Sequence, residues 1–265
     1  ARCGLVSDVT LYEDTPTRYL NDVQRRHRWI RGDWQIAAWL RRCVPLANGQ
    51  RMRNPLSMLS QWKLFDNLRR SLVSPALMGL LVLGWVWGSG SPVWVLSVLG
   101  ILFLPALAHA TLEACRKSVD IMPMQHVRQV VGTLQRKLLQ SLFMLACLPY
   151  EAWYNLDAIV RTLARLLFTQ RPLLEWQAAS GEGLHASLRA VRLDLWPAPA
   201  SAVLVALYLL VNQPTRLWVA APILLLWLTA PWVELWLSRP LRPDHKALNL
   251  EQKAFLGRLA RRTWH

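Results

Sequence analysis

The chain has 265 residues, of which 53% are hydrophobic, and it combines 15 tryptophans with a formal net charge of +15. A soluble basic protein does not normally show this combination, whereas a membrane protein with basic segments on one side of the bilayer does. The positive charge is therefore interpreted mainly as a topology signal, which argues against nucleic acid as a partner. The four cysteines and six histidines lack the spacing of a disulfide framework or a metal site, so we predict neither.

The first segment with a distinctive composition is 21–35, which reads NDVQRRHRWIRGDWQ. Asp22 is a candidate helix N-cap, and a helix is predicted from there to about residue 40. Gly32 is expected to break or kink this helix, because glycine is unfavourable inside helices.

Arg25, Arg28 and Trp29 would share one face of that helix, because residues three and four apart are neighbours on a helix surface. An arginine offers a planar fork of donors for phosphate or for adjacent sugar hydroxyls. An indole offers a flat apolar face on which a pyranose ring can stack. From the residues alone, sugar binding and anchoring to lipid headgroups are equally open.

Four later stretches have the length and low polarity of transmembrane helices. Tryptophans lie near their ends, where amphipathic rings favour the headgroup layer. Short loops, 88–92 and 212–216, join them into two hairpins. The predicted spans are 72–87, 93–111, 197–211 and 217–237.

Two further stretches are apolar on one side but too short or too polar to span a membrane. Residues 138–150 are followed by Glu151 and Asp157, which a spanning helix would bury. We therefore expect amphipathic helices lying at, or dipping into, the cytoplasmic face over 138–167 and over 61–72. An ordinary helix packed on a soluble domain is the alternative.

The basic residues predict the orientation in the membrane. Of the 31 lysines and arginines, all but Arg216 lie in 1–70, 113–195 and 238–265. By the positive-inside rule these three segments face the cytoplasm and the two hairpin turns lie outside. We thus expect a multi-pass protein of the bacterial inner membrane with cytoplasmic termini.

A motif resemblance favours the sugar among the alternatives for 21–35. The run Arg25-Arg26-His27-Arg28-Trp29 resembles the [QR]xxRW motif of membrane-integrated, processive family-2-type glycosyltransferases, the cellulose-synthase-like enzymes. Gly4, Val9, Glu13-Asp14 and Pro16 before it, and Gly32 and Gln35 after it, follow the order seen in those enzymes.

The chain is most similar to cyclic β-1,2-glucan synthases, and the resemblance covers essentially its whole length. Five stretches carry it in the family's order. They are GLVSDVTLYEDTPTRY, RRHRWIRGDWQ, NPLSMLSQWKLFDNLRRSLV, LPYEAWYNLDAIVRTLARLLFTQRPLLEWQ and EQKAFLGRLARRTW.

The resemblance implies a processive, inverting glucosyltransferase that extends a β-1,2-glucan from UDP-glucose and passes it through the inner membrane. Arg25, Arg28 and Trp29 would bind the glucan acceptor, with Trp29 as the stacking surface. Further candidates for substrate contact are Glu13, Asp14, Arg26, Gly32 and Gln35, and the sequence gives Glu13 and Asp14 no chemical role. Membrane lipids and the rest of the same polypeptide are the other expected partners.

The family's DxD motif and general-base aspartate would lie upstream of Gly4, and no DxD occurs in the chain. We therefore expect no catalytic residue and no metal or cofactor site in this piece. A divalent cation (Mg or Mn) and the UDP-glucose site would belong to the full-length enzyme. Since the chain starts without methionine and stops at RRTWH, we interpret it as an internal fragment that is inactive by itself.

The predicted fold is mainly α, a polytopic membrane protein with about four transmembrane helices, cytoplasmic interfacial helices and the N-terminal remnant of a GT-A type α/β domain. A membrane anchor, an interaction module or a transporter segment without transferase activity is the alternative. The expected divisions are the end of the glycosyltransferase domain (1–70), transmembrane hairpin 1 (71–112), a cytoplasmic interfacial segment (113–195), transmembrane hairpin 2 (196–237) and a cytoplasmic linker towards a downstream domain (238–265).

Overall fold

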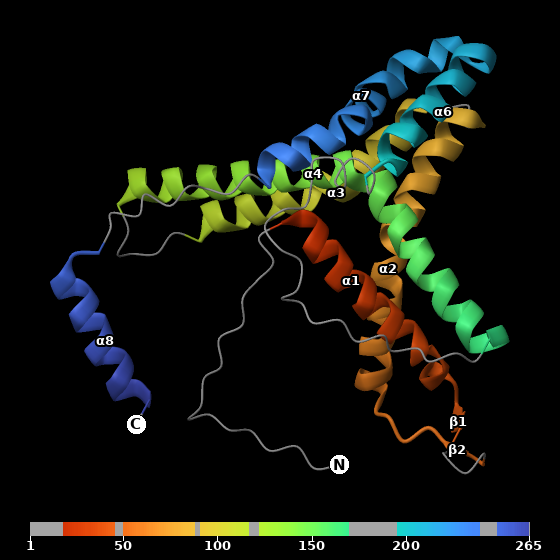
Figure 1. Cartoon of the computed structure of the whole chain (residues 1–265). Helices are drawn as coiled ribbons and strands as arrows, with labels where there is room; N and C mark the ends of the chain where they lie inside the picture. Colours follow the sequence, from red (N-terminus) through yellow and green to blue (C-terminus); the bar gives the residue numbers. More distant parts are fainter. Residues whose placement is uncertain are drawn as a thin grey trace.

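In the computed structural model, which describes residues 18–45, 50–87, 91–116, 122–169, 195–238 and 248–264, α-helices account for most of the chain (Figure 1). The helix α8 lies apart from the other helices, which pack together. The elements are α1 (Tyr19–Gln35), the 3₁₀ helix η1 (Ala37–Leu40), β1 (Cys43–Pro45), β2 (Arg51–Arg53), α2 (Met58–Val86), α3 (Ser91–Cys115), α4 (Pro123–Ala164), the π-helical turn η2 (Arg165–Thr169), α6 (Pro197–Asn212), α7 (Pro214–Leu237) and α8 (Leu250–Trp264).

The apolar core of the fold is shared by α2, α3, α4, α6 and α7. Trp85 of α2 and Trp227 of α7 are fully buried in it, with ring centroids 5.6 Å apart. The helices α2 and α3 meet so closely that a Cβ atom on Gly84 would lie 2.5 Å from the Cβ of Trp94. Glycine at position 84 therefore permits this close packing.

Two core helices contain a proline whose missing N–H is replaced by a side chain from a neighbouring helix. Pro149 of α4 cannot donate to the Leu145 carbonyl, which instead accepts from the Trp227 indole at 3.0 Å. Pro75 of α2 likewise cannot donate to the Ser71 carbonyl, which instead accepts from the Asn155 amide nitrogen at 3.0 Å. A buried carbonyl without a partner is costly, so these two bonds make the prolines tolerable.

We expect Trp227→Phe to lower the free energy of unfolding, because the Leu145 carbonyl loses its donor. The unpaired carbonyl should account for roughly 1–3 kcal/mol. In the Pro149→Ala variant, residue 149 regains an N–H that can donate to the Leu145 carbonyl. In that variant, Trp227→Phe should therefore lower the free energy of unfolding by less. Thermal unfolding of the four proteins in detergent measures the difference. Equal losses in both backgrounds would show that the indole contributes only by packing.

The helix α1 differs from its prediction at both ends and in its middle. It begins at Tyr19 with Arg18 as the N-cap, so Asp22 lies in the first turn and is not the cap. A carboxylate is favourable there, near the positive end of the helix dipole. The helix continues through Gly32 and ends at Gln35, so the expected break is wrong. Packing of the helix against α2 and α4 outweighs the modest cost of one glycine.

The short helices expected over 138–167 are replaced by one helix, α4, which has 42 residues and is roughly 60 Å long. Residues 145–152 of α4 are all buried, and the helix packs against α1, α2, α3, α6 and α7. In the last part of this amphipathic stretch, the apolar side chains do not share one environment, since Ile159 is buried whereas Val160 and Leu167 are exposed. Tertiary contacts from five helices thus stabilise a continuous helix where the local sequence pattern indicated separate ones.

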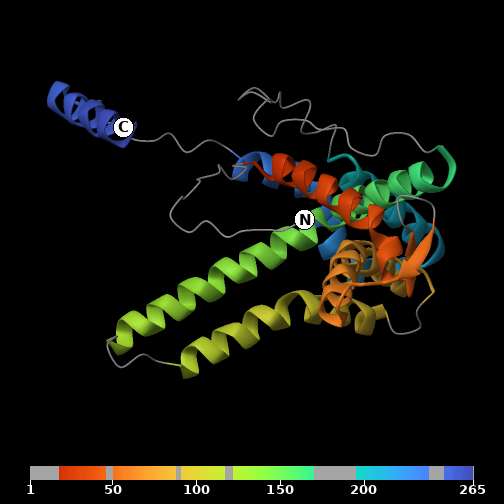
Figure 2. The ribbon, with the colours of Figure 1, turned by 90° about the horizontal axis from the view of Figure 1, so that it is seen from below.

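The first half of α4 runs antiparallel to α3, and the two helices extend together from the rest of the bundle (Figure 2). The Ser141 hydroxyl donates to the Leu102 carbonyl at 3.0 Å, and the His126 ring lies 3.3 Å from the Ala114 carbonyl. These two contacts fix the first half of α4 against α3.

Two of the described helices, α3 over 92–115 and α7, are long and apolar enough to cross a membrane. About 22% of the most apolar window of α3 and 39% of that of α7 are buried, unlike the core helix of a soluble protein. The other two predicted spans are not confirmed. The helix α6 has 16 residues, roughly 24 Å, which is shorter than the ~30 Å hydrocarbon layer. The helix α2 carries Lys63, Arg69 and Arg70 in its first half.

The predicted remnant of a GT-A domain is not confirmed. In the described part of 1–70, the strands β1 and β2 pair in an antiparallel ribbon with Cys43 opposite Arg53, which is too small to define a domain. Residues 1–17, including Glu13 and Asp14, lie outside the described residues.

Candidate functional site

The helix α1 is fixed to the bundle by its apolar side. Leu20 and Val23 are buried in a cluster with Tyr150 of α4 and Leu195. The rest of α1 is rich in arginine, so its polar side chains are directed to the surfaces of α2 and α4 and to solvent. This amphipathic arrangement places Arg26, Arg28 and Trp29 at the junction of three helices.

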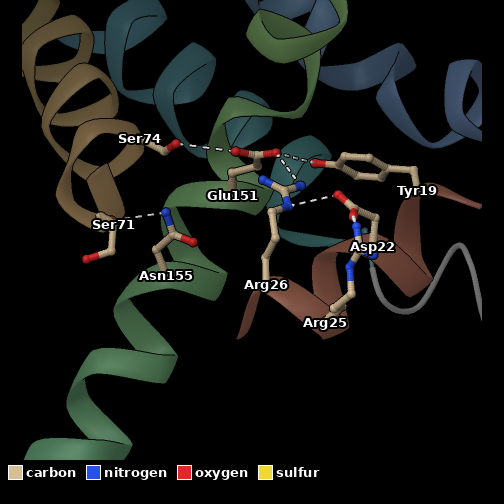
Figure 3. A network of polar contacts seen from close by, with 8 residues as sticks. All are labelled: Tyr19, Asp22, Arg25, Arg26, Ser71, Ser74, Glu151 and Asn155. Carbon is tan, nitrogen blue, oxygen red and sulfur yellow. Dashed lines mark hydrogen bonds and ion pairs between the residues drawn. The ribbon is translucent and has the colours of Figure 1, made fainter. Parts of the chain in front are cut away.

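A buried carboxylate, Glu151 of α4, connects α1 to the bundle (Figure 3). Its Oε1 accepts hydrogen bonds from the Tyr19 hydroxyl at 2.9 Å and from the Arg26 guanidinium at 3.0 Å. Its Oε2 lies 3.4 Å from the Ser74 hydroxyl of α2. Arg26 also pairs with Asp22 at 3.0 Å on its own helix. One carboxylate thus holds side chains from α1 and α2 at the same point of α4.

The electrostatics of this network favour an ionised Arg26 and a neutral Tyr19. Burial lowers the pKa of Arg26, but the charge of Glu151 and its hydrogen bond outweigh burial and raise that pKa above its ordinary value. Burial raises the pKa of Tyr19, and the nearby Glu151 charge raises it further. The phenol therefore stays a hydrogen-bond donor to the carboxylate over the physiological range.

A second contact between α1 and α4 involves His27. Its Nε2 lies 3.2 Å from the Asp157 carboxylate, which also accepts from Arg161 at 2.7 Å. The imidazole packs edge-on against the ring of Tyr154, with centroids 4.5 Å apart. Burial lowers the pKa of His27 below its ordinary value, although the hydrogen bond to Asp157 opposes this shift.

We expect this lowered pKa to make stability depend on pH. Below about pH 6.5, the ordinary pKa of histidine, the unfolded chain binds a proton that the folded protein does not yet bind. The contribution of neutral His27 to the free energy of unfolding is complete above that pH, and it is lost as the pH falls through the lowered pKa of His27 in the folded protein. Unfolding temperatures measured from pH 7.5 to 5 should fall less steeply for His27→Gln than for the wild type. Identical slopes would exclude His27 as the titrating group.

A pocket of about 730 Å³ lies between α1, α2 and α4. Its walls include Arg26, Arg28, Trp29 and Gly32 from α1, Asn67, Arg70 and Ser71 from α2, and Glu151 and Asn155 from α4.

Trp29 is the exposed aromatic of this pocket, with 58% of its surface accessible. The Arg25 guanidinium covers the ring at 4.9 Å from its centroid, and Arg25 also pairs with Asp22 at 2.7 Å. The arginine covers one face of the indole and restrains its orientation. Arg25 thus supports Trp29, and it is not among the residues that line the pocket.

The wall that α2 contributes is held by side chains of α1. The Trp34 indole donates to the Ser71 hydroxyl at 3.0 Å, and the Asn67 amide donates to Asp33 at 3.1 Å. Asn67 also accepts from Arg70. These bonds set the width of the pocket by fixing α1 against α2.

The structure therefore brings together most of the candidate residues that it describes. Arg26, Arg28, Trp29 and Gly32 line the pocket, and Arg25 packs on Trp29. Gln35 ends α1 and does not line the pocket.

The sequence did not indicate the contributions of α2 and α4 to the pocket, above all those of Glu151 and Asn155. The one available signal was a carboxylate in an apolar stretch, at Glu151. A buried carboxylate requires a cationic or hydrogen-bonding partner, and Arg26 of the motif meets that requirement.

The fold and the pocket together define a helical bundle with membrane-spanning candidates and a pocket, lined by arginine and tryptophan, beside the middle of α2. The chain is 32% identical over 270 residues to the cyclic beta-(1,2)-glucan synthase NdvB of Rhizobium meliloti (strain 1021). This alignment covers 100% of the chain and 9% of that protein. No family model matches the chain. The resemblance to cyclic β-1,2-glucan synthases is thus confirmed along the whole chain.

Proposed function

We propose that this chain is the acceptor-binding and membrane-embedded segment of a synthase that makes cyclic β-1,2-glucan. The observation that carries the proposal is the pocket in which Trp29 and Arg28 lie together, in a chain similar over its whole length to such a synthase. The full-length protein would be a glucosyltransferase that uses UDP-glucose. This segment would bind the growing glucan.

The size and lining of the pocket suit a sugar chain. Small-molecule sites commonly measure about 300–1,000 Å³, and about 730 Å³ is room for a few sugar residues. The exposed indole of Trp29 can stack on the C–H face of a pyranose. The polar side chains around it can bond the equatorial hydroxyls at the edge of the same ring.

Positive charge on α1 gives the pocket a second function in the proposed reaction. Arg28 carries a planar cation at the pocket wall, where it could bind a diphosphate leaving group as well as sugar hydroxyls. Arg26 is committed to Glu151 and Asp22, so we assign it a positioning role. We therefore assign the ligand contacts of this helix to Arg28 and Trp29, and to Arg25 the support of Trp29.

The divalent cation implied by the resemblance finds no fitting set of ligands in the described ranges. No group of three or more His, Cys, Asp or Glu side chains there could hold a metal ion. We therefore assign no step of this segment to a metal.

The proposal includes an inner-membrane location with the pocket on the cytoplasmic side. The large apolar side chains exposed on α3 and α7, such as Leu96 and Trp218, would contact lipid. The basic side chains of α1 and α2 would lie on the cytoplasmic side.

A labelling experiment tests the orientation. In a protein whose four cysteines are replaced, Gln213→Cys, in the turn between α6 and α7, should react with an impermeant thiol reagent added to spheroplasts. Asn249→Cys, just before α8, should react only after the membrane is opened. The reverse pattern would overturn the proposed topology, since the positive-inside rule requires the basic segments to be cytoplasmic.

Direct binding tests the function itself. Calorimetric titration of the purified full-length protein with a β-1,2-linked glucose trisaccharide should show one saturable site. The binding should weaken by at least about tenfold in Trp29→Ala, since stacking and burial are both lost. Absence of binding to the wild type would favour the alternative that this segment is only a membrane anchor.

A further inference from the structure

We propose that Asn155 of α4 is a specificity-determining residue of the α1–α2–α4 pocket, whose Oδ1 accepts a hydrogen bond from one hydroxyl of the bound sugar chain. The inference rests on the proposed function of the pocket as a glucan site. It adds a residue far from the arginine–tryptophan motif in the sequence and assigns it a specific contact.

The chemistry of its partner fixes which way the Asn155 amide points. Its nitrogen lies 3.0 Å from the Ser71 carbonyl oxygen, and a carbonyl can only accept a hydrogen bond. The amide nitrogen must therefore face Ser71, and the amide oxygen must point away from it. Figure 3 shows this arrangement, with the oxygen of Asn155 directed away from α2.

Pro75, inside α2, favours this orientation of the Asn155 amide. Pro75 has no N–H, so the Ser71 carbonyl has no donor from its own helix and remains available to Asn155. Ser71 is buried, and its hydroxyl is held by the Trp34 indole. The amide of Asn155 is thus fixed before any ligand binds, which lowers the entropy cost of recognition.

The oxygen of Asn155 is free to bind a ligand. Within the described residues no hydrogen bond to its Oδ1 is found, and Asn155 lines the pocket. The other amide of the pocket, Asn67, is different, because its nitrogen bonds Asp33 and its oxygen accepts from Arg70. Asn155 is therefore the amide that can recognise a ligand.

A neutral oxygen that only accepts selects one chemical class of ligand. It favours a hydroxyl donor and disfavours phosphate or carboxylate oxygens, which cannot donate when ionised. The cationic Arg28 lies on the α1 wall of the same pocket. The α4 wall is thus suited to a sugar hydroxyl, and the α1 wall also suits an anion.

Monodeoxy ligands test the inference. The full-length protein is titrated with the β-1,2-linked glucose trisaccharide and with analogues that each lack one hydroxyl. The wild type should bind one analogue roughly three- to tenfold more weakly than the parent, as expected for one lost hydrogen bond. In a variant that lacks the Oδ1 of Asn155, that analogue and the parent trisaccharide should bind with equal affinity.

The variant for this test is Pro75→Ala combined with Asn155→Ala. Asn155→Ala alone leaves the Ser71 carbonyl without a donor, so a loss of binding could reflect misfolding. Alanine at position 75 supplies an N–H for that carbonyl, which separates the structural bond from the ligand bond. Pro75→Ala alone is the matched control, because it keeps the Asn155 Oδ1, and it should still discriminate between the parent and the analogue.

The outcomes separate the two levels of the proposal. Loss of discrimination in the double variant, with discrimination kept in Pro75→Ala alone, supports Asn155 as the specificity residue. Continued discrimination in the double variant, or equal binding of all analogues by the wild type, overturns this inference and leaves the glucan site intact. No binding of the parent trisaccharide by the wild type overturns the proposed function itself.

Discussion

Replacing Trp29 with alanine in the full-length protein should lower glucan elongation by at least about tenfold while membrane insertion stays normal. The indole is 58% exposed and lines the pocket, so its removal costs little in folding but takes away the stacking surface. Stacking contributes roughly 0.5–1.5 kcal/mol beyond the buried area, and 1.4 kcal/mol is a factor of ten. Trp29→Phe should keep part of the activity, because a smaller ring still stacks. The measurement is incorporation of labelled glucose from UDP-glucose, normalised to folded protein in the membrane.

The matched control for Trp29 is Trp62→Ala. Trp62 of α2 is 61% exposed, close to the value for Trp29, but it does not line the pocket. If exposed tryptophans serve only as interfacial anchors, both variants should reduce insertion and leave elongation per inserted protein unchanged. Wild-type elongation by Trp29→Ala would falsify the acceptor function of the motif.

The second large effect is expected at Glu151. Glu151→Ala removes the partner that Tyr19, Arg26 and Ser74 share, and it leaves the Arg26 guanidinium with Asp22 alone. The loss of stability should be smaller than for a fully buried charge that loses its partner, because the Arg26 side chain is 35% exposed. We therefore expect a loss of roughly 1–3 kcal/mol in the free energy of unfolding. Helix α1 should detach before the bundle unfolds, which hydrogen exchange of its amides can detect.

Two further variants separate charge from shape at this site. Glu151→Gln keeps an acceptor oxygen for Tyr19 and Arg26 and should lose less stability than Glu151→Ala. The double variant Arg26→Met, Glu151→Leu removes both charges and should be more stable than the sum of the single losses predicts. Strict additivity of the single and double variants would show that the pair contributes no coupling and that α1 is held by its apolar side alone.

Activity should respond to Glu151 differently from Trp29. Glu151 positions α1 against α2 and α4, so its loss should change the affinity for acceptor and the unfolding temperature together. Trp29 contacts the ligand directly, so its loss should affect acceptor affinity and elongation without changing the unfolding temperature. This contrast distinguishes a residue that positions the helix from one that binds the sugar.

Much of the candidate site could be predicted because its chemistry is local. Arg28 and Trp29 are adjacent in sequence, and Arg25 is three residues before Arg28, so any helix places them near one another. The resemblance to glucan synthases rests on the same local runs, and it is confirmed over the chain. The assignment of these residues to an acceptor stays a prediction until binding is measured.

Helix boundaries were less predictable because they depend on tertiary contacts as well as on local sequence signals. Asp22 has the side chain of an N-cap, and Gly32 has the propensity of a helix breaker, yet α1 extends past both. Packing of α1 on α2 and α4 supplies more free energy than either signal. The same reason explains why α4 continues through Pro149, whose lost hydrogen bond is compensated by Trp227.

By itself, then, the sequence determined the features that depend on neighbours along the chain: apolar helices, basic segments between them, and an arginine–tryptophan face on one helix. Only the tertiary structure decided that Arg26 meets Glu151 across 125 positions, and that Asn155 meets Ser71 across 84. Helical periodicity specifies contacts three and four residues apart, whereas contacts between distant segments depend on how whole helices pack. The pocket belongs to this second class, because each of its three walls comes from a different helix.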